Sequence, residues 1–412
     1  MLKFSLMILI ASVSFGVNAH PNKEILKGFI TRGDVSKSIG NRNGFDNPFE
    51  NSNKPQDWAK YVDGVVLQVE WSTLEPRDDE YNFEIIKNAL NTLREYNKEN
   101  GTNLGLKLRV FAGQYSPRHI LNNPNIGSTY VSYSSSNDRK GRMANFWVST
   151  FMDEYVELHK ELAKEFDSTS TENRARNNRN AILREVSITA CMMKSADMHR
   201  AEDGDNYLDR ERDNKTNIGA LMAAGLTFES DFDCQLDQIS KTADIWKNTW
   251  VSVARAHFND YSNHSGIKPK SGERMNENWP LAVSKMKQIV NKCRSYSNCI
   301  IGNNSLEYKE TRNNNAAFFD PSNAVYYVSQ KYNLRGDNVG LRKAPIYFQT
   351  VVSVQKYPDE NKSKIHNVIN KALDATNIVM IELPTLSALK KYNSNYLRSQ
   401  SMQDVRMRLK NN

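Results

Sequence analysis

The sequence predicts an α/β protein of the (β/α)8 TIM-barrel class, and two features carry this prediction. Short runs of β-branched and aromatic residues alternate with longer stretches of helical periodicity, and there are eight such runs. This alternation indicates parallel β/α units, and eight strands are the number that closes a barrel. The expected strands are Ile25–Thr31, Asp63–Trp71, Leu104–Ala112, Leu183–Met192, Trp250–Phe258, Cys299–Asn303, Pro345–Val352 and Ile378–Leu383.

The stretches between these strands place apolar residues at the i, i+3, i+4 and i+7 spacing of helices that face a core. Three faces are clear in the sequence. They are Ile86, Ala89, Leu90 and Leu93; then Phe151, Tyr155, Leu158 and Leu162; and finally Ile365, Val368, Ile369 and Ala372. Each face is expected to cover the outside of the barrel.

The composition supports one well-packed protein. The chain has 412 residues, of which 39% are hydrophobic and 10% aromatic, which excludes a disordered chain. The mean hydropathy of −0.66 argues against a protein with several membrane spans. Lys and Arg exceed Asp and Glu by 55 to 47, giving a net charge of +8. Because the basic residues are scattered, we expect no nucleic-acid partner.

Residues 1–19 read as a signal peptide. Lys3 provides a positive charge, a short apolar stretch follows, and Val17-Asn18-Ala19 is a small-residue cleavage site. Cleavage there would leave residues 20–412 as the mature protein, secreted or periplasmic, without a membrane span. A retained N-terminal anchor is the alternative.

Export would allow the four cysteines to form disulfides. Cys293 and Cys299 flank a short loop and are the expected pair, which leaves Cys191 and Cys234 for a second bond. Four buried free thiols are the alternative.

Two long loops follow expected strands, over residues 113–142 and 194–227. Loops after the C-terminal ends of barrel strands carry the sites of barrel enzymes, so we expect both on the same rim. No change of composition indicates a second domain, and we expect residues 20–412 to form a single domain and a monomer.

Several cofactor and catalytic motifs are absent from the sequence: G-x-G-x-x-G, the P-loop, G-x-S-x-G and H-E-x-x-H. Asp203-Gly204-Asp205 begins like a calcium loop, but Tyr207 and Leu208 occupy positions that need a ligand and a glycine. We therefore expect no cofactor and no metal.

The second and third expected strands carry the most informative motifs. They read W-x-x-L-E-P from Trp71, Y-x-F from Tyr81, and K-L-R-V-x-A-G from Lys107. This pattern resembles TIM-barrel glycoside hydrolases of the large retaining clan, the β-galactosidase-like and cellulase-like enzymes. It is also similar to a branch of secreted bacterial barrels with S-A-E-M after the fourth strand and L-E-V/L-Y in the last. Here these segments read Ser195–Met198 and Ile381–Pro384.

The resemblance implies a carbohydrate substrate or ligand. In such barrels an arginine at the position of Arg109 commonly braces a catalytic carboxylate, although an ion pair without substrate is equally compatible with a buried arginine. Trp71 ends a strand, where its ring could stack on a sugar.

Glycoside hydrolysis usually needs one protonated and one ionised carboxyl group, about 5 Å apart for retention and farther for inversion. Glu382 lies within an apolar strand and is the strongest candidate for the ionised group, with Arg109 or a lysine as its partner. For the proton donor, Asp197 is favoured by the resemblance and Glu70 by its position. Asp34 and Asp260 also lie near strand ends. Glu185, at the start of a strand, is expected to be structural.

The sequence departs from the clan at its usual catalytic positions. The Asn-Glu of the fourth strand is missing, and the seventh strand carries Gln349, which cannot ionise. Polar or aromatic residues at strand ends are nevertheless expected to bind sugar hydroxyls. This group comprises Tyr115, His257, Asn259, Asn303 and Gln349. Two functions follow: hydrolysis of O-glycosidic bonds by a rearranged carboxylate pair, or a catalytically silent barrel that binds glycan or a surface partner.

Overall fold

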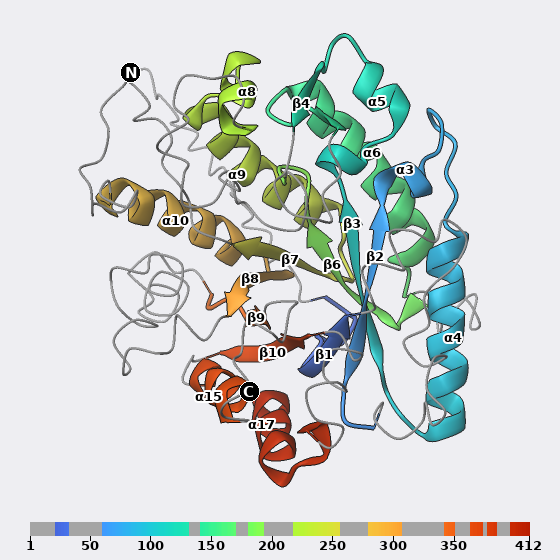
Figure 1. Ribbon diagram of the computed structural model, residues 1–412. Helices are drawn as coiled ribbons and strands as arrows, with labels where there is room; N and C mark the ends of the chain where they lie inside the picture. Colours follow the sequence, from blue (N-terminus) through green and yellow to red (C-terminus); the bar gives the residue numbers. More distant parts are fainter. Residues whose placement is uncertain are drawn as a thin grey trace, which may run out of the picture.

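The computed structural model describes residues 21–32, 60–131, 141–169, 180–192, 217–255, 279–306, 342–350, 363–373, 377–384 and 396–412, and the statements below concern these residues. Eight parallel strands form a closed barrel in the order β1-β10-β9-β8-β7-β6-β3-β2, which confirms the (β/α)8 class (Figure 1). The strands are β1 (Gly28–Arg32), β2 (Gly64–Glu70), β3 (Gly105–Phe111), β6 (Leu183–Ile188), β7 (Trp250–Arg255), β8 (Cys299–Leu306), β9 (Ile346–Thr350) and β10 (Ile378–Leu383).

Helices surround the barrel (Figure 1). They are α3 (Trp71–Leu74), α4 (Glu84–Asn100), α5 (Arg118–Asn122), α6 (Ser149–Phe166), α8 (Asn217–Ala223), α9 (Phe228–Ile245), α10 (Trp279–Arg294), α15 (Ser363–Ala372) and α17 (Gln400–Asn411). The three apolar faces expected from the sequence belong to α4, α6 and α15, and all twelve of their residues are buried. None of the helices within these described ranges is long and apolar enough to cross a membrane.

Several strand bounds differ from the expectation: β1 begins at Gly28 and β8 extends to Leu306, and two further strands end before the expected residue. The fourth expected strand was to reach Met192, but β6 ends at Ile188 and residues 189–192 form a turn. The second was to include Trp71, but Trp71 begins the short helix α3. In both places the chain leaves the barrel earlier than a run of apolar residues suggests, because apolar side chains also pack under the rim.

The two long loops contain secondary structure that the sequence did not predict. Residues 113–142 include the 3-10 turn η1 (Gly113–Tyr115), α5, the strand β4 (Ser128–Val131) and the start of β5 (Gly141–Ala144), which pairs with β4 as an antiparallel hairpin. In the second loop α8 contacts β4. The described parts of the two loops therefore meet at one end of the barrel (Figure 1). Residues 132–140 and 194–216 lie outside the described residues.

The apolar core has two parts. The larger one lies between the strands and the surrounding helices, and a smaller one fills the barrel interior, with Ile30, Val66, Trp250, Ile300 and Tyr347 among its members. Packing in the interior is tight: a Cβ added at Gly302 would lie 1.9 Å from the Tyr347 ring, so the glycine makes room for that ring.

Both disulfides are formed. Cys293 pairs with Cys299, as expected, and Cys191 pairs with Cys234, which links the turn after β6 to α9. No cysteine in the chain is free.

Candidate functional site

Four charged side chains meet inside the barrel. Lys107 Nζ lies 2.6 Å from Glu185 Oε1 and 2.8 Å from Glu382 Oε1, and Arg109 Nη2 lies 2.6 Å from Glu382 Oε1. All four side chains are at most 2% exposed. We call these four residues the interior charge cluster. The pairing of Glu382 with Arg109 fulfils the sequence expectation that this buried carboxylate has a basic partner.

The alternation of side chains along parallel strands explains this convergence. Lys107 and Arg109 are two residues apart on β3, so both point into the barrel. On β6 the residue beside Lys107 is Glu185, and on β2 the residue beside Arg109 is Gln68. Glu382 on β10 lies beside Gln349 of β9. The cluster therefore crosses the interior from β3 to β6 and β10.

The cluster fixes the charges of its members. Burial by itself raises the pKa of Glu382, but Arg109 and Lys107 outweigh it and lower this pKa to about 2. Burial by itself lowers the pKa of Lys107, but Glu185 and Glu382 raise it above its usual value. Lys107 Nζ also lies 3.5 Å from the centroid of the Tyr347 ring. Glu382 is thus ionised at neutral pH and cannot donate a proton.

Two glutamines continue the cluster with amide groups. Arg109 donates from Nη2 to Gln349 Oε1 at 3.2 Å and from Nη1 to Gln68 Oε1 at 3.4 Å. Gln349 is half-buried, whereas Gln68 is buried. Among the described residues, the interior polar atoms without a hydrogen-bond partner include Gln68 Nε2, Ser187 Oγ and Ser252 Oγ. Buried polar groups are seldom left unpaired, so these atoms are suited to water or a hydroxylated ligand.

The remaining polar candidates fall into three groups. Glu70, the last residue of β2, is half-buried and accepts a hydrogen bond from Ser72 Oγ at 3.2 Å. Asn303 lies in β8, in register with Phe348 of β9. Asp197, His257 and Asn259 lie outside the described residues, as do Asp34 and Asp260.

The two aromatic candidates are buried, which corrects the expectation for Trp71. Its side chain is 0% exposed, its indole N–H donates to Glu75 Oε2 at 2.6 Å, and its ring packs edge-on against Phe151 and Tyr155. It is a core residue that offers no face to a sugar. Tyr115 is also buried, with its ring centroid 5.5 Å from that of Phe111.

Sequence reasoning missed two basic residues. Lys107 bridges Glu185 and Glu382, and its signal was its position two residues before Arg109 in an apolar strand. Arg32 ends β1 and donates from Nη2 to the Thr350 carbonyl at 2.6 Å and from Nε to the Leu383 carbonyl at 3.2 Å. Its charge also contributes to lowering the Glu382 pKa.

One described group has the composition of a metal site. Glu75, Asp78 and His119 bring three possible ligand atoms within 4.8 Å of one another. His119 Nε2 lies 3.2 Å from Glu75 Oε1 and 3.9 Å from Asp78 Oδ1. An imidazole that pairs with two carboxylates explains this geometry without an ion, and we assign no metal to it.

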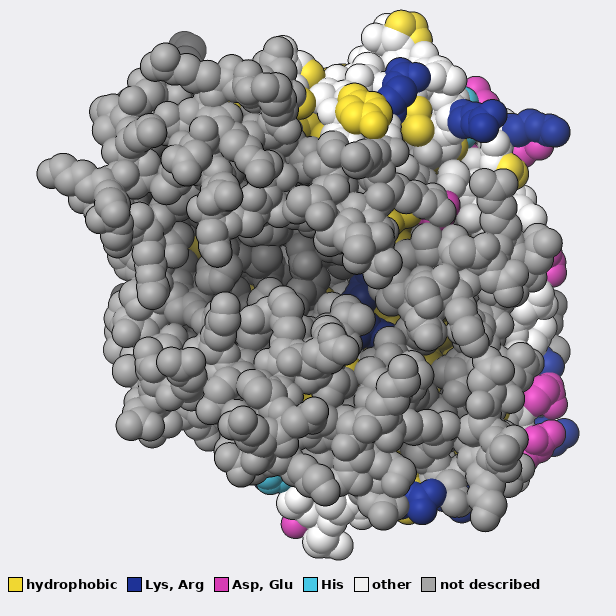
Figure 2. Space-filling view, in the orientation of Figure 1, with side chains coloured by type: hydrophobic (Ala, Val, Ile, Leu, Met, Phe, Trp, Pro, Cys, Tyr) yellow, Lys and Arg dark blue, Asp and Glu magenta, His cyan; other side chains and the backbone are white. Residues whose placement is uncertain are grey.

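In the space-filling view, Lys or Arg side chains are visible near the centre of the face turned to the reader (Figure 2). A barrel interior with polar and charged side chains agrees with this view.

No protein-family model matches the sequence, and no curated protein matches it either. Solved structures of similar fold include an endo-1,4-β-xylanase from Caldicellulosiruptor owensensis, at 9% identity and a TM-score of 0.43, with 88% of this chain and 85% of that chain covered. A psychrophilic glycoside hydrolase family 10 endo-β-1,4-xylanase matches at 9% identity and a TM-score of 0.43, with 92% of this chain and 96% of that chain covered. A β-galactosidase from Rahnella sp. R3 matches at 11% identity and a TM-score of 0.45, with 94% of this chain and 56% of that chain covered. Similarity this distant assigns no activity, and the fold assignment rests on the barrel itself.

Proposed function

We propose that this protein is an exported glycoside-hydrolase-like barrel that binds carbohydrate at its C-terminal rim without the usual pair of catalytic carboxylates. The observation that carries the proposal is the state of Glu382. Arg109 donates to both of its carboxylate oxygens, at 2.6 and 2.9 Å, and Lys107 contacts Oε1. Lys107 also pairs with Glu185, a second carboxylate that is fully buried.

This arrangement differs from that of a hydrolytic pair. Hydrolysis needs one carboxyl group that holds a proton and space between the two groups for the sugar or water. Here a lysine lies between the two carboxylates, and the pKa of Glu382 is held at about 2. At the seventh strand Gln349 provides an amide, which binds hydroxyl groups but does not attack an anomeric carbon.

Carbohydrate as the ligand is supported by the motifs in residues 71–83 and 107–113 and by the chemistry of the interior. Amide, guanidinium and hydroxyl groups from several strands converge there, and some have no partner of their own. A sugar hydroxyl both donates and accepts hydrogen bonds, so it matches such a mixed set. Export is supported by the N-terminal pattern and by two disulfides, which persist in oxidising compartments.

A second function is favoured by one observation, the ionised state of Glu382. If the Glu382 carboxylate stabilised the positive charge of an oxocarbenium-like transition state, the protein would hydrolyse glycosidic bonds. The proton donor would then be Glu70, by position, or Asp197, by resemblance. Glu70 is the more direct test, because it is half-buried and a substitution there leaves the interior charge cluster intact.

The decisive experiment combines retention on insoluble polysaccharides with a screen of chromogenic glycosides, using protein that comprises residues 20–412. We expect retention on at least one polysaccharide, weaker retention for Gln349→Ala, and unchanged retention for Lys87→Gln on the outer face of α4. We expect no glycoside to be hydrolysed. Absence of retention on every polysaccharide would overturn the proposal. Hydrolysis that is lost in Glu70→Gln would establish the second function instead.

A further inference from the structure

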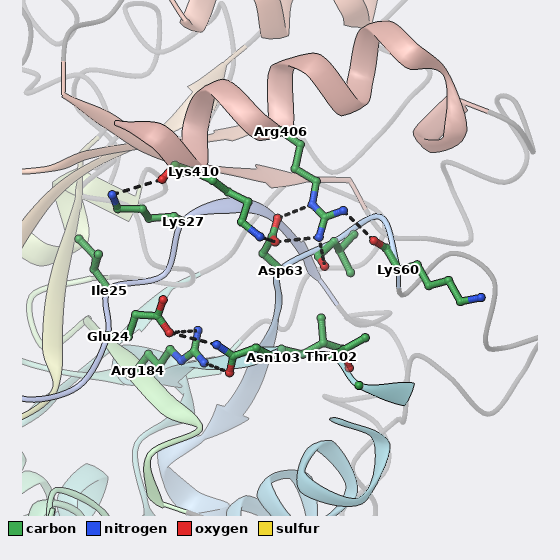
Figure 3. Close-up of a pocket in the computed structure, with 13 residues that line it drawn as sticks. Glu24, Ile25, Lys27, Lys60, Asp63, Thr102, Asn103, Arg184, Arg406 and Lys410 are labelled. Carbon is green, nitrogen blue, oxygen red and sulfur yellow. Dashed lines mark hydrogen bonds and ion pairs between the residues drawn. The ribbon is translucent and has the colours of Figure 1, made fainter. Parts of the chain in front are cut away.

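A pocket of about 380 Å³ opens at the N-terminal end of the barrel, away from the carboxyl ends of the strands (Figure 3). Its wall comes from the segment before β1, the residues before β2 and β3, the start of β6, and α17. Thirteen residues line it, and those used below are Glu24, Lys27, Lys60, Asp63, Arg184, Arg406 and Lys410. We call it the basal pocket. Its volume is in the range of small-molecule sites.

The pocket has more positive than negative charge. Five of its lining side chains are basic and two are acidic, which leaves a formal excess of three positive charges. Asp63 is already saturated: Arg406 contacts both of its oxygens at 2.7 and 2.8 Å, Lys410 Nζ lies 3.2 Å away, and the Phe29 N–H donates to it. It cannot compensate a further cation.

The remaining acidic group is also engaged. Glu24 lies 3.2 Å from Arg184 and accepts a hydrogen bond from Asn103. Within the described ranges, Lys27 Nζ contacts a backbone carbonyl, that of Lys410 at 3.4 Å, and neither Lys27 nor Lys60 has a carboxylate within salt-bridge distance. Figure 3 shows the two ion-paired groups on either side of the pocket, with Lys27 beside Lys410 and the Lys60 ammonium directed outward.

One of the five basic side chains also has a buried donor without an acceptor. Arg184 is 8% exposed, and its Nε has no hydrogen-bond partner. The side chain crosses Gly105, where an added Cβ would lie 2.8 Å from Arg184 Cδ and 3.0 Å from Nε. An N–H that is shielded from water and has no acceptor is unfavourable, so a ligand oxygen that accepted from it would be favourable.

We propose that the basal pocket binds a small multivalent oxyanion, a phosphate- or sulfate-bearing solute. Arginine forks and lysine ammonium groups are the usual partners of such oxyanions. An anion of charge −2 or −3 would offset the excess of positive charge and connect the N-terminal segment to α17. The site is separate from the interior charge cluster, and it does not depend on the proposed carbohydrate function.

The test is isothermal titration of the mature protein with inorganic phosphate, and in parallel with inorganic sulfate, at low ionic strength against a chloride control. We expect saturable binding of at least one anion and a rise of the melting temperature with its concentration. The double substitution Lys27→Gln/Lys60→Gln removes two charges that support no carboxylate. It should weaken binding by about tenfold or more. The matched control, Lys87→Gln/Lys160→Gln, removes two charges from the outer helices α4 and α6.

The anion that binds with the higher affinity would indicate whether the ligand is a phosphate or a sulfate compound. The proposal is overturned if neither anion binds the unmodified protein. It is equally overturned if the basal double variant and the control double variant bind the anion with the same affinity.

Discussion

The interior charge cluster and the basal pocket contain the same types of charged side chain but differ in their exposure to water. In each, a carboxylate is shared by an arginine and a lysine: Glu382 by Arg109 and Lys107, and Asp63 by Arg406 and Lys410. The interior cluster has two carboxylates for two cations and is at most 2% exposed, whereas the basal pocket has an excess of cations and is open to water.

The difference follows from solvation. A charge taken out of water is tolerated only with a partner close by, so the two cations of the interior charge cluster are matched by two carboxylates. In the basal pocket, water screens the extra lysines. The excess of positive charge is therefore tolerated and can interact with a ligand. Equal substitutions should therefore have unequal effects at the two places.

The largest effect is expected for Glu382→Gln. This change removes the carboxylate that pairs with Arg109 and one of the two that pair with Lys107. Breaking a buried pair typically costs about 3–5 kcal/mol. Chemical denaturation followed by circular dichroism would measure the loss. A free energy of unfolding equal to that of the unmodified protein would show that the cluster is not important for stability.

Acid titration should show a related effect. The pKa of Glu382 is lowered from 4.5 to about 2 in the folded protein. The stabilisation from this group is therefore complete above about pH 4.5 and is lost as the pH falls toward 2. It amounts to about 3 kcal/mol for a shift of this size. Unfolding measured between pH 5 and 2 should show this loss, and the same curve for Glu382→Gln should be flatter. Parallel curves would contradict the assignment.

Asp63→Asn should cost less, about 1–2 kcal/mol, because Arg406 and Lys410 can turn toward water when their partner loses its charge. The amide retains an oxygen to accept from the Phe29 N–H. Thermal unfolding at two salt concentrations would separate the contributions, since salt weakens only the charged one. A loss as large as that for Glu382→Gln would remove the contrast between the two regions.

Lys27→Gln should have the smallest effect, within about 0.5 kcal/mol without added anion, because no carboxylate depends on it. The melting temperature of the Lys27→Gln variant in chloride should match that of the unmodified protein. A clear destabilisation would mean that Lys27 supports the fold and not a ligand.

The sequence by itself determined the barrel and much of its core. Strand and helix periods identify which residues face inward, because a closed barrel buries every strand on both sides and each helix on one. The faces of α4, α6 and α15, the pairing of Cys293 with Cys299, and a basic partner for Glu382 all followed from such local rules. Glu185 was also expected to be structural, and it pairs with Lys107.

Only the tertiary structure decided which groups share a partner. Lys107 serves both Glu185 and Glu382 because three strands, distant in sequence, place these side chains at neighbouring levels of the interior. Trp71 ends a strand-like run, yet the chain turns into α3 and buries the indole against α6. The basal pocket combines residues 24–27 with residues 406 and 410, which meet because barrel closure places β1 beside β10 and α17 against both. Sequence periodicity records which way a side chain points, but not which distant side chain it meets.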